Sequence, residues 1–467
     1  MKPSIPKLVP AALAALLAFA APAWSQRFQP CSDAATLPAL AGSLCMTATM
    51  PLRQTVAEGS TAETVDLFVR KIPATDPARR RGEVWLVAGG PGETGASFLP
   101  VLPVLRRAFP NHDLIFPDHR GTGYSSKLCP EQEAPASANG ISLAGEEWGP
   151  CIGAMHANAA RTRAFTITNA AHDLSALIRR HRGRGETYLY GVSYGTQLVL
   201  RMMQVTPVPL TGIILDGLVP PESAPQWDLS QRTRVVDAVG RAVLAPDQAE
   251  RYRLILARND PPWKAAVPGG NLRQFMGALL NFPELRDQIP AIIGALARDD
   301  AAPLTRAAGE LRAEMAKLGA SPQSPPSLPL VILISGSENN ARRDLTRELV
   351  EREAEGALFT SPIPGMLVDS PLPLYEPDAF FGHTPARLPR TLVIHGTLDP
   401  NTPFEGAQAH VAMLARAGDV RLATVTGGAH FLPLVAPRCF VQAAAAFVAR
   451  RTAPDRCEEA NAQPARD

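Results

Sequence analysis

A serine between two glycines is the first feature of the sequence that could carry out a reaction. Gly191-Val192-Ser193-Tyr194-Gly195 has the pattern G-x-S-x-G. An apolar segment at Tyr188 to Tyr190 precedes it and a helix-forming segment at Thr196 to Gln204 follows it, so we expect a strand, a sharp turn and a helix. In that setting the glycines let the backbone turn and the Ser193 hydroxyl projects as a nucleophile. A glycine-rich structural turn is the alternative interpretation.

A serine hydroxyl needs a base that removes its proton, and two histidines are candidates. His430 follows a predicted strand and the loop Thr426-Gly427-Gly428-Ala429, from which its ring can reach the turn at Ser193. His410 lies in an apolar helical segment, so we expect a structural role for it. The chain order of nucleophile, acid and histidine expected for this serine motif agrees with His430 as the base.

The acid that orients the histidine is expected at the end of a strand. Asp399 lies in the loop His395-Gly396-Thr397-Leu398-Asp399-Pro400, just beyond an apolar strand-like segment. Such loops, at the carboxyl ends of parallel strands, are where sites of this architecture form. Asp216, after the segment Ile213 to Leu215, is the rival acid, and we expect it to support a loop instead.

A second glycine-rich segment, Ala88-Gly89-Gly90-Pro91-Gly92, directly follows a predicted strand. Backbone N–H groups at Gly89 and Gly90, together with that of Tyr194, would form an oxyanion hole for a carbonyl substrate. A structural turn is the simpler alternative. The loop from Asp118 to Ser125 follows the next strand, and its glycine spacing does not fit a phosphate-binding loop.

Short apolar segments separated by helical ones set the fold class. After a predicted antiparallel hairpin, strands alternate with helices, which predicts a mostly parallel sheet with helices on both faces. The helix that covers one face is expected at Thr168 to Arg180. The expected strands are Met46 to Leu52, Val65 to Val69, Val84 to Ala88, Leu114 to Phe116, Tyr188 to Tyr190, Ile213 to Leu215, Thr391 to Ile394 and Arg421 to Val425.

Between about Val219 and about Pro385 the pattern becomes mainly helical, with proline-rich connections such as Ser321 to Pro329. This segment predicts an inserted cap at residues 219–385, and residues 26–218 and 386–467 would form the core. The apolar segment Leu330 to Ile334 stands out within the cap as strand-like.

The first residues have the organisation of a secretory signal. Lys2 and Lys7 precede an apolar segment from Leu8 to about Ala23, and Ala23-Trp24-Ser25 fits a cleavage site before Gln26. Residues 1–25 are therefore predicted to be removed, with export to the periplasm or the extracellular space. A membrane anchor is the alternative, but the segment is short and contains prolines. No later segment approaches the about 20 apolar residues of a membrane helix.

Six cysteines agree with an oxidising compartment. Pairing neighbours along the chain closes the shortest loops and predicts Cys31–Cys45, Cys129–Cys151 and Cys439–Cys457, although the sequence leaves other pairings open. No C-x-x-C and no histidine pair at i, i+4 is present, so we expect no metal. The formal net charge of +2 comes entirely from Lys2 and Lys7, which argues against nucleic acid or an anionic membrane as the main partner.

These motifs occur in the order found in the serine peptidase family of proline iminopeptidase and the secreted tripeptidyl aminopeptidases, which the chain resembles over nearly its whole mature length. The resemblance rests on Gly89 to Gly92, Asp118 to Ser125, Gly191 to Gly195, Gly396 to Asp399 and Gly428 to His430. It implies an α/β-hydrolase fold, no cofactor, and release of N-terminal residues or short peptides through an acyl-enzyme. Ala88, where proline iminopeptidases have His, and Tyr194, where they have Trp, favour the tripeptidyl branch or an unassigned hydrolase.

An aminopeptidase needs a carboxylate for the free amine of its substrate. The tripeptidyl branch has a Glu-Asp pair after an apolar segment, and here Glu338 and Asn339 stand at those positions. Glu338 is therefore the predicted anchor, with Glu93 and Glu222 as rivals and a solvated loop residue as the alternative. An esterase or lipase-like hydrolase acting on small esters is the second functional hypothesis, since a fold does not fix a substrate. A non-catalytic binding protein is the third.

Overall fold

The computed structural model describes residues 27–35, 37, 40–54, 63–319, 321, 323 and 325–459. The predicted signal segment, residues 1–25, and its cleavage site lie outside the described residues. Within them, no helix combines the length and the apolarity that crossing a membrane requires.

A ten-stranded sheet forms the centre of the described structure, in the order β1-β2-β3-β5-β4-β6-β7-β8-β9-β10. The first strands pair antiparallel and all pairs from β5 through β4 to β10 are parallel, which confirms the predicted mostly parallel sheet. The strands are β1 Gln29–Pro30, β2 Leu44–Pro51, β3 Thr64–Ile72, β4 Gly82–Val87, β5 His112–Pro117, β6 Glu186–Val192, β7 Gly212–Asp216, β8 Thr391–Gly396, β9 Val420–Thr426 and β10 Arg456–Glu458.

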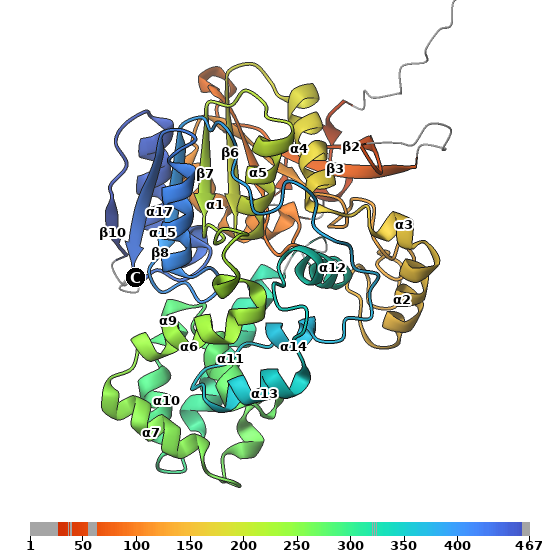
Figure 1. Ribbon diagram of the computed structural model, residues 1–467. Coiled ribbons are helices and arrows are strands. Elements are labelled where there is room, and N and C mark those ends of the chain that lie inside the picture. The colour runs from red at the N-terminus through yellow and green to blue at the C-terminus, as the bar shows by residue number, and fades with distance from the viewer. Residues whose placement is uncertain are drawn as a thin grey trace, which may run out of the picture.

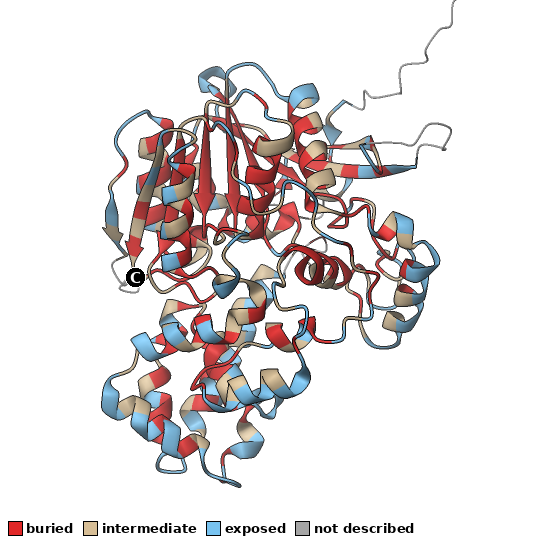
Figure 2. Cartoon of the chain, in the orientation of Figure 1, coloured by how far each residue is buried: buried red, intermediate tan, exposed pale blue. Residues whose placement is uncertain are grey.

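Helices cover both faces of this sheet. Neighbouring strand residues point to opposite faces, so Trp85 and Leu189 pack into one apolar cluster while Leu86 and Tyr190 pack into another. The central strands are accordingly buried (Figure 2). The first face is covered by α4 Ile167–His181, α5 Tyr194–Val205 and α15 Phe404–Leu414, and the second by α1 Leu102–Ala108 and α17 Pro437–Val448.

The described chain between β7 and β8 is helical and has its own apolar cluster. In Figure 1 most of these helices gather below the sheet, coloured green to cyan. They are α6 Arg232–Ala242, α7 Pro246–Leu256, α8 Leu272–Leu279, α9 Pro283–Arg286, α10 Ile289–Leu296, α11 Ala302–Leu318, α12 Leu328–Glu338, α13 Arg347–Glu355 and α14 Ile363–Leu367. The boundaries 219 and 385 stay a prediction, because Leu330, Leu333 and Leu372 pack into the core cluster of the sheet and not into the cluster of these helices.

The strand-like interpretation of Leu330 to Ile334 is wrong, because these residues lie inside the helix α12. Helix α12 carries apolar or small side chains on all sides and is largely buried, so its sequence lacks the polar stripe that marks a surface helix. The periodicity of a short apolar segment does not separate a buried helix from a buried strand. The consequence for the site is that Glu338 is the last residue of a helix.

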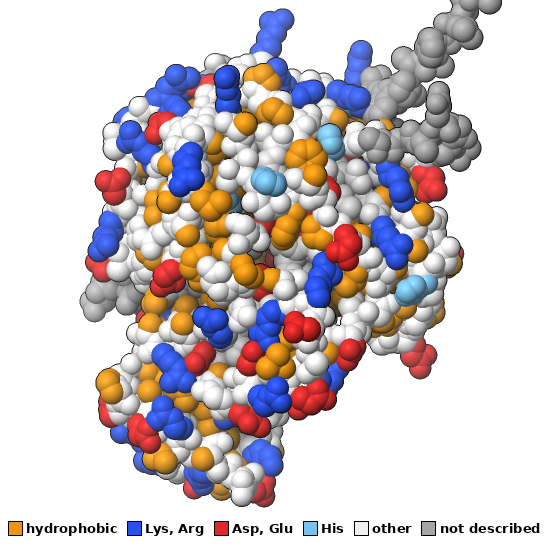
Figure 3. Space-filling model, viewed as in Figure 1, with side chains coloured by type: hydrophobic (Ala, Val, Ile, Leu, Met, Phe, Trp, Pro, Cys, Tyr) orange, Lys and Arg blue, Asp and Glu red, His pale blue; other side chains and the backbone are white. Residues whose placement is uncertain are grey.

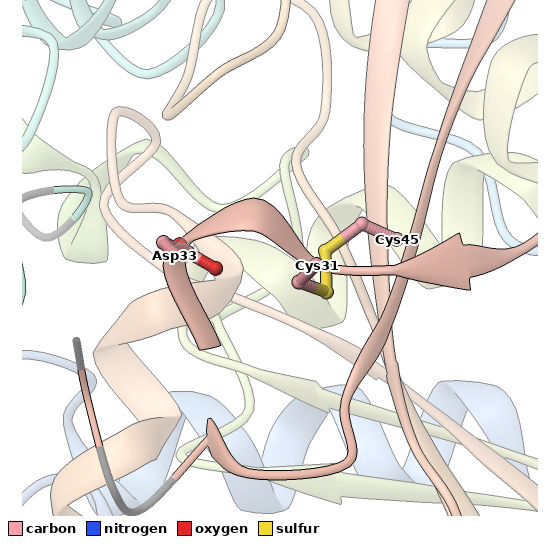
Figure 4. Close-up of side chains that lie close together, drawn as sticks. All are labelled: Cys31, Asp33 and Cys45. Carbon is pink, nitrogen blue, oxygen red and sulfur yellow. A yellow bond between two sulfur atoms is a disulfide. The ribbon is translucent and has the colours of Figure 1, made fainter. Parts of the chain in front are cut away.

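Three disulfides join cysteines that are neighbours along the chain: Cys31–Cys45, Cys129–Cys151 and Cys439–Cys457. These are the pairs favoured by the short loops they close. Figure 4 shows the first of them with Asp33 beside it. The carboxylate of Asp33 forms an ion pair with Arg70 at 2.6 Å, and both sulfur atoms belong to the disulfide.

Candidate active site

Ser193 occupies a strained turn between β6 and α5. Its φ and ψ are 54° and −126°, a combination that costs non-glycine residues free energy and that clusters at functional sites. A Cβ atom at Gly191 would lie 2.6 Å from the carbonyl oxygen of Gly195, and one at Gly195 would lie 2.4 Å from that of Val87. Glycine is therefore required on both sides of Ser193 by close backbone approach, as the G-x-S-x-G pattern predicts.

Asp399 and His430 form a hydrogen-bonded pair. His430 Nδ1 donates to Asp399 Oδ2 at 2.7 Å, and the same carboxylate accepts from the backbone N–H groups of Asn401 and Thr402 and from the Thr402 hydroxyl. Burial alone raises the pKa of Asp399, but the charge of His430 and these hydrogen bonds hold it below its ordinary value. Burial lowers the pKa of His430, and the charge and hydrogen bond of Asp399 outweigh this and raise it.

The rival residues have other partners. Asp216 accepts a hydrogen bond from the Tyr190 hydroxyl at 2.7 Å and one from the backbone N–H of Leu432 at 3.2 Å, and its burial raises its pKa to about 7. His410 is buried and its Nδ1 contacts the carbonyl oxygen of Val219 at 2.7 Å. Of the two acids, Asp399 is the one that hydrogen-bonds His430.

A glycine that the sequence analysis did not single out makes room for the histidine. At Gly217, which directly follows β7, a Cβ atom would lie 2.8 Å from Cε1 and 3.0 Å from Nδ1 of His430. Gly217 also has a φ of +56°, which glycine adopts without strain. Its position after a buried strand and an aspartate is the only sequence signal for this role.

Two cavities meet at Ser193. One, here named the apolar cavity, has a volume of about 760 Å³ and is lined mostly by apolar side chains together with His430. The other, here named the charged cavity, has a volume of about 470 Å³ and is lined by Tyr194, Glu222 and Glu338 among others. Ser193 and His430 share the apolar cavity, although no hydrogen bond joins them among the described residues. In enzymes without a substrate such contacts are often long and tighten on binding.

The predicted oxyanion loop lies beside the serine. Gly90 lines both cavities together with Ser193, and a Cβ atom at Gly89 would lie 3.1 Å from Cβ of Ser193. Tyr194 is the first residue of α5, where backbone N–H groups lack partners within the helix. A hydrogen bond from the backbone of Gly89 lowers the pKa of Glu93, although burial raises it more. The Gly89-Gly90 pair and the start of α5 thus lie beside Ser193, where the sequence predicts the oxyanion hole.

Glu338 and Glu222 are brought together by Arg201, a residue that the sequence analysis missed. Arg201 Nη2 donates to both carboxylate oxygens of Glu222 at 2.9 and 3.0 Å, and Nη1 donates to Glu338 Oε2 at 3.3 Å and to the more exposed Asp378 at 3.5 Å. The Arg201 side chain is 1% exposed. An arginine within the apolar helix sequence Leu198 to Met203 was the available signal, because a buried guanidinium requires partners.

Glu338 also accepts two neutral hydrogen bonds, from the Tyr375 hydroxyl at 2.7 Å and from the backbone N–H of Ile167 at 3.2 Å. Burial raises its pKa, and Arg201 opposes that rise. Glu338 is thus a buried, partnered carboxylate at the wall of the charged cavity, and the solvated-loop alternative does not describe it. Glu93 lies instead in the apolar cavity, and among the described residues its carboxylate has no ion-pair partner.

Family models match two segments of the chain. A family model described as the alpha/beta hydrolase fold matches residues 84–280, and one described as TAP-like protein matches residues 372–460. A comparison with curated proteins finds no match.

Solved structures with a similar chain course include a thermophilic esterase from Thermogutta terrifontis with malate bound, which is 17% identical over 86% of this chain and 98% of its own, with a TM-score of 0.37. VinJ is 15% identical over 87% and 99%, with a TM-score of 0.39, and a hydrolase from Pseudomonas aeruginosa PA01 is 15% identical over 83% and 96%, with a TM-score of 0.37. The two family models together place the chain in the α/β-hydrolase family, in its tripeptidyl-aminopeptidase-like branch.

Proposed function

We propose that this protein is an exported serine aminopeptidase that releases N-terminal residues or short peptides. The observation that carries the proposal is the cluster at the charged cavity, where Glu222 and Glu338 share one guanidinium beside Ser193. Export is supported by the three disulfides, which persist in oxidising compartments, and by the N-terminal segment of the sequence.

The proposed reaction begins with attack of Ser193 Oγ on the carbonyl carbon of the scissile bond, while His430 Nε2 takes the hydroxyl proton. Asp399 holds the imidazole in the required orientation and stabilises its charged form. The negative oxygen of the tetrahedral intermediate would accept hydrogen bonds from the backbone N–H groups of the Gly89-Gly90 pair and of Tyr194.

The intermediate collapses when the bond to the leaving amine breaks and His430 gives its proton to that nitrogen. The acyl group is then an ester of Ser193. A water molecule adds to this ester, His430 again takes and returns the proton, and the carboxylic acid product and the free serine hydroxyl result. The reaction consumes one water molecule, and the groups named are sufficient for each of its proton transfers.

The charge of the cluster explains how an amine would be selected. Three carboxylates, those of Glu222, Glu338 and the more exposed Asp378, pair with the one guanidinium of Arg201, so the ionised cluster has two more negative than positive charges. An ammonium group of the substrate would offset part of that charge, and it would also lower the pKa of Glu338 and favour its ionised form. Charge-assisted hydrogen bonds of this kind are strong where water is excluded.

The apolar cavity favours a second candidate function. Its volume of about 760 Å³ and its lining, which includes Val236, Phe275 and Phe282, would accept a large apolar acyl or alcohol group. An esterase needs only such a cavity beside the triad and no carboxylate for an amine.

Matched substrates separate the two functions. We would compare kcat/KM for a tripeptide anilide with a free N-terminus, the same anilide acetylated at the amine, and small neutral esters. The aminopeptidase proposal expects the free amine to be preferred over its acetylated form by more than about tenfold, since one charged interaction is worth at least 1.4 kcal/mol. Equal rates on both anilides would refute recognition of the amine, and hydrolysis of the esters alone would establish the esterase.

A further inference from the structure

Arg232 is the cationic residue that the two cavities share. It is the first residue of α6, and it lines both cavities together with Gly90 and Ser193. The charge of Arg232 lowers the pKa of His430, and the charge of Asp399 raises the pKa of Arg232. Arg232 is therefore close enough to the triad to act electrostatically on it, and it faces the space that a substrate must occupy.

The half-buried guanidinium of Arg232 lacks a carboxylate partner, in contrast to the buried arginines Arg120 and Arg201. Its Nη1 donates to Asn401 Oδ1 at 2.7 Å, and no described carboxylate lies within 4.0 Å of it. By contrast, Arg120 is paired with Asp173 at 2.7 Å and Arg201 with Glu222 at 2.9 Å. Burial lowers the pKa of Arg232 to about 10, so the group remains a cation at neutral pH with donors that have no anionic acceptor.

We infer that Arg232 binds a carboxylate of the substrate on the leaving-group side of the scissile bond. This inference rests on the proposed function, in which the amine end of the substrate is recognised, and it concerns recognition of the opposite end. His430 must protonate the leaving atom and lines the apolar cavity, whereas the paired carboxylates line the charged cavity. A substrate with its amine in the charged cavity thus places its leaving segment past His430, where Arg232 is the available cation.

The substrates expected from this role of Arg232 are short peptides whose leaving segment carries a carboxylate. The carboxylate is either the free C-terminus of a short peptide or the side chain of an acidic residue after the scissile bond. A guanidinium presents parallel donors that match a carboxylate, which makes arginine well suited to this recognition.

The competing interpretation is a positioning role through Asn401. The backbone N–H of Asn401 donates to Asp399 Oδ1 at 2.7 Å, so Arg232 could hold the loop of the acid and touch no substrate. The two roles differ in one measurable way. Loss of a positioning residue lowers turnover of all substrates by the same factor, whereas loss of a carboxylate receptor lowers it only for anionic ones.

The test compares Arg232→Gln with the wild-type protein on a tetrapeptide with a free C-terminus and on the C-terminal amide of the same tetrapeptide. We expect the wild type to prefer the free acid by at least about tenfold in kcat/KM, and Arg232→Gln to lose that preference. Arg232→Lys keeps a cation and should retain part of it, and it serves if the glutamine variant does not fold. Arg234→Gln, at an exposed position of the same helix, should match the wild type.

A further pair of peptide amides, with Glu or Gln directly after the scissile bond, distinguishes an acidic side chain from a free C-terminus. Esters with and without a carboxylate on the leaving alcohol repeat the measurement without a peptide bond or an amine. If peptides are not cleaved but the ester pair still shows the preference and its loss, the aminopeptidase proposal fails and the assignment of Arg232 stands. No preference in the wild type for any anionic substrate, or a preference that survives in Arg232→Gln, overturns the assignment.

Discussion

Replacing Glu338 by Gln tests the amine anchor with little change of shape. The two neutral hydrogen bonds to Glu338, from Tyr375 and Ile167, both end on Oε1, and the carbonyl oxygen of a glutamine can accept them. The ion pair with Arg201 is made by Oε2, so the substitution removes a charge while the neutral contacts persist. A neutral ester places no charge near this position and should be hydrolysed at nearly the wild-type rate.

The expected loss for a free-amine peptide follows from the buried position. Removing one partner of a buried charge pair costs about 2–5 kcal/mol, which corresponds to roughly 30- to 4,000-fold in kcat/KM. We expect a value near the lower limit, because Glu222 remains beside the cavity and keeps one carboxylate near the ammonium. The acid group of Glu338 also has a raised pKa, so the wild-type preference for the amine should strengthen as the pH rises and the carboxylate ionises.

The assay measures kcat/KM for the free-amine tripeptide anilide and for a small neutral ester, and the ratio of the two values is compared between proteins. The proteins are the wild type, Glu338→Gln and the control Glu351→Gln, whose residue is exposed. A thermal unfolding curve for each variant checks that the fold persists. The ratio would stay unchanged in Glu338→Gln if kcat/KM fell equally for both substrates or for neither. That result would refute Glu338 as the amine anchor and direct attention to Glu93, the carboxylate in the apolar cavity.

Three further predictions concern the triad and the disulfides. Ser193→Ala should lose about a millionfold in turnover and all labelling by a fluorophosphonate at an unchanged melting temperature; persistent labelling would place the nucleophile elsewhere. The carboxylate of Asp216 raises the pKa of His430, so Asp216→Asn should move the acidic limb of the kcat/KM profile to lower pH, and an unmoved limb would contradict that coupling. Replacing Cys439 and Cys457 by Ser opens a loop of sequence separation 18 and should cost about 3 kcal/mol in denaturant unfolding; an unchanged midpoint would exclude a stabilising disulfide.

The candidate triad residues could be predicted because each one lies at the end of a strand with a local pattern. Ser193 follows β6, Asp399 follows β8 and His430 follows β9, and neighbouring parallel strands end at the same edge of a sheet. The chain order of three short motifs therefore implies a meeting point in space. This reasoning needs no knowledge of side-chain packing, which explains why the same residues are found together in the structure.

The helices between β7 and β8 could not be placed in this way. Their positions depend on which apolar faces pack together, and α12 shows the difficulty, since Val331 to Ile334 is an apolar segment that fits a buried strand equally well. Pro329, at the start of the helix, was the local signal for a helix in that segment. Without the helix, the position of Glu338 relative to Ser193 could only be taken from the resemblance to a family.

Arg201 shows why the substrate site and the fold cannot be considered apart. It lies on α5, the helix that begins directly after Ser193, and its guanidinium reaches Glu338 at the end of α12 and Glu222 after β7. One ion-pair cluster therefore fixes the position of α12 relative to the nucleophile and also sets the charge of the cavity wall. Because a buried ion pair contributes little net stability but costs several kcal/mol when one partner is lost, this cluster is better explained by the geometry and charge it gives the cavity than by stability alone.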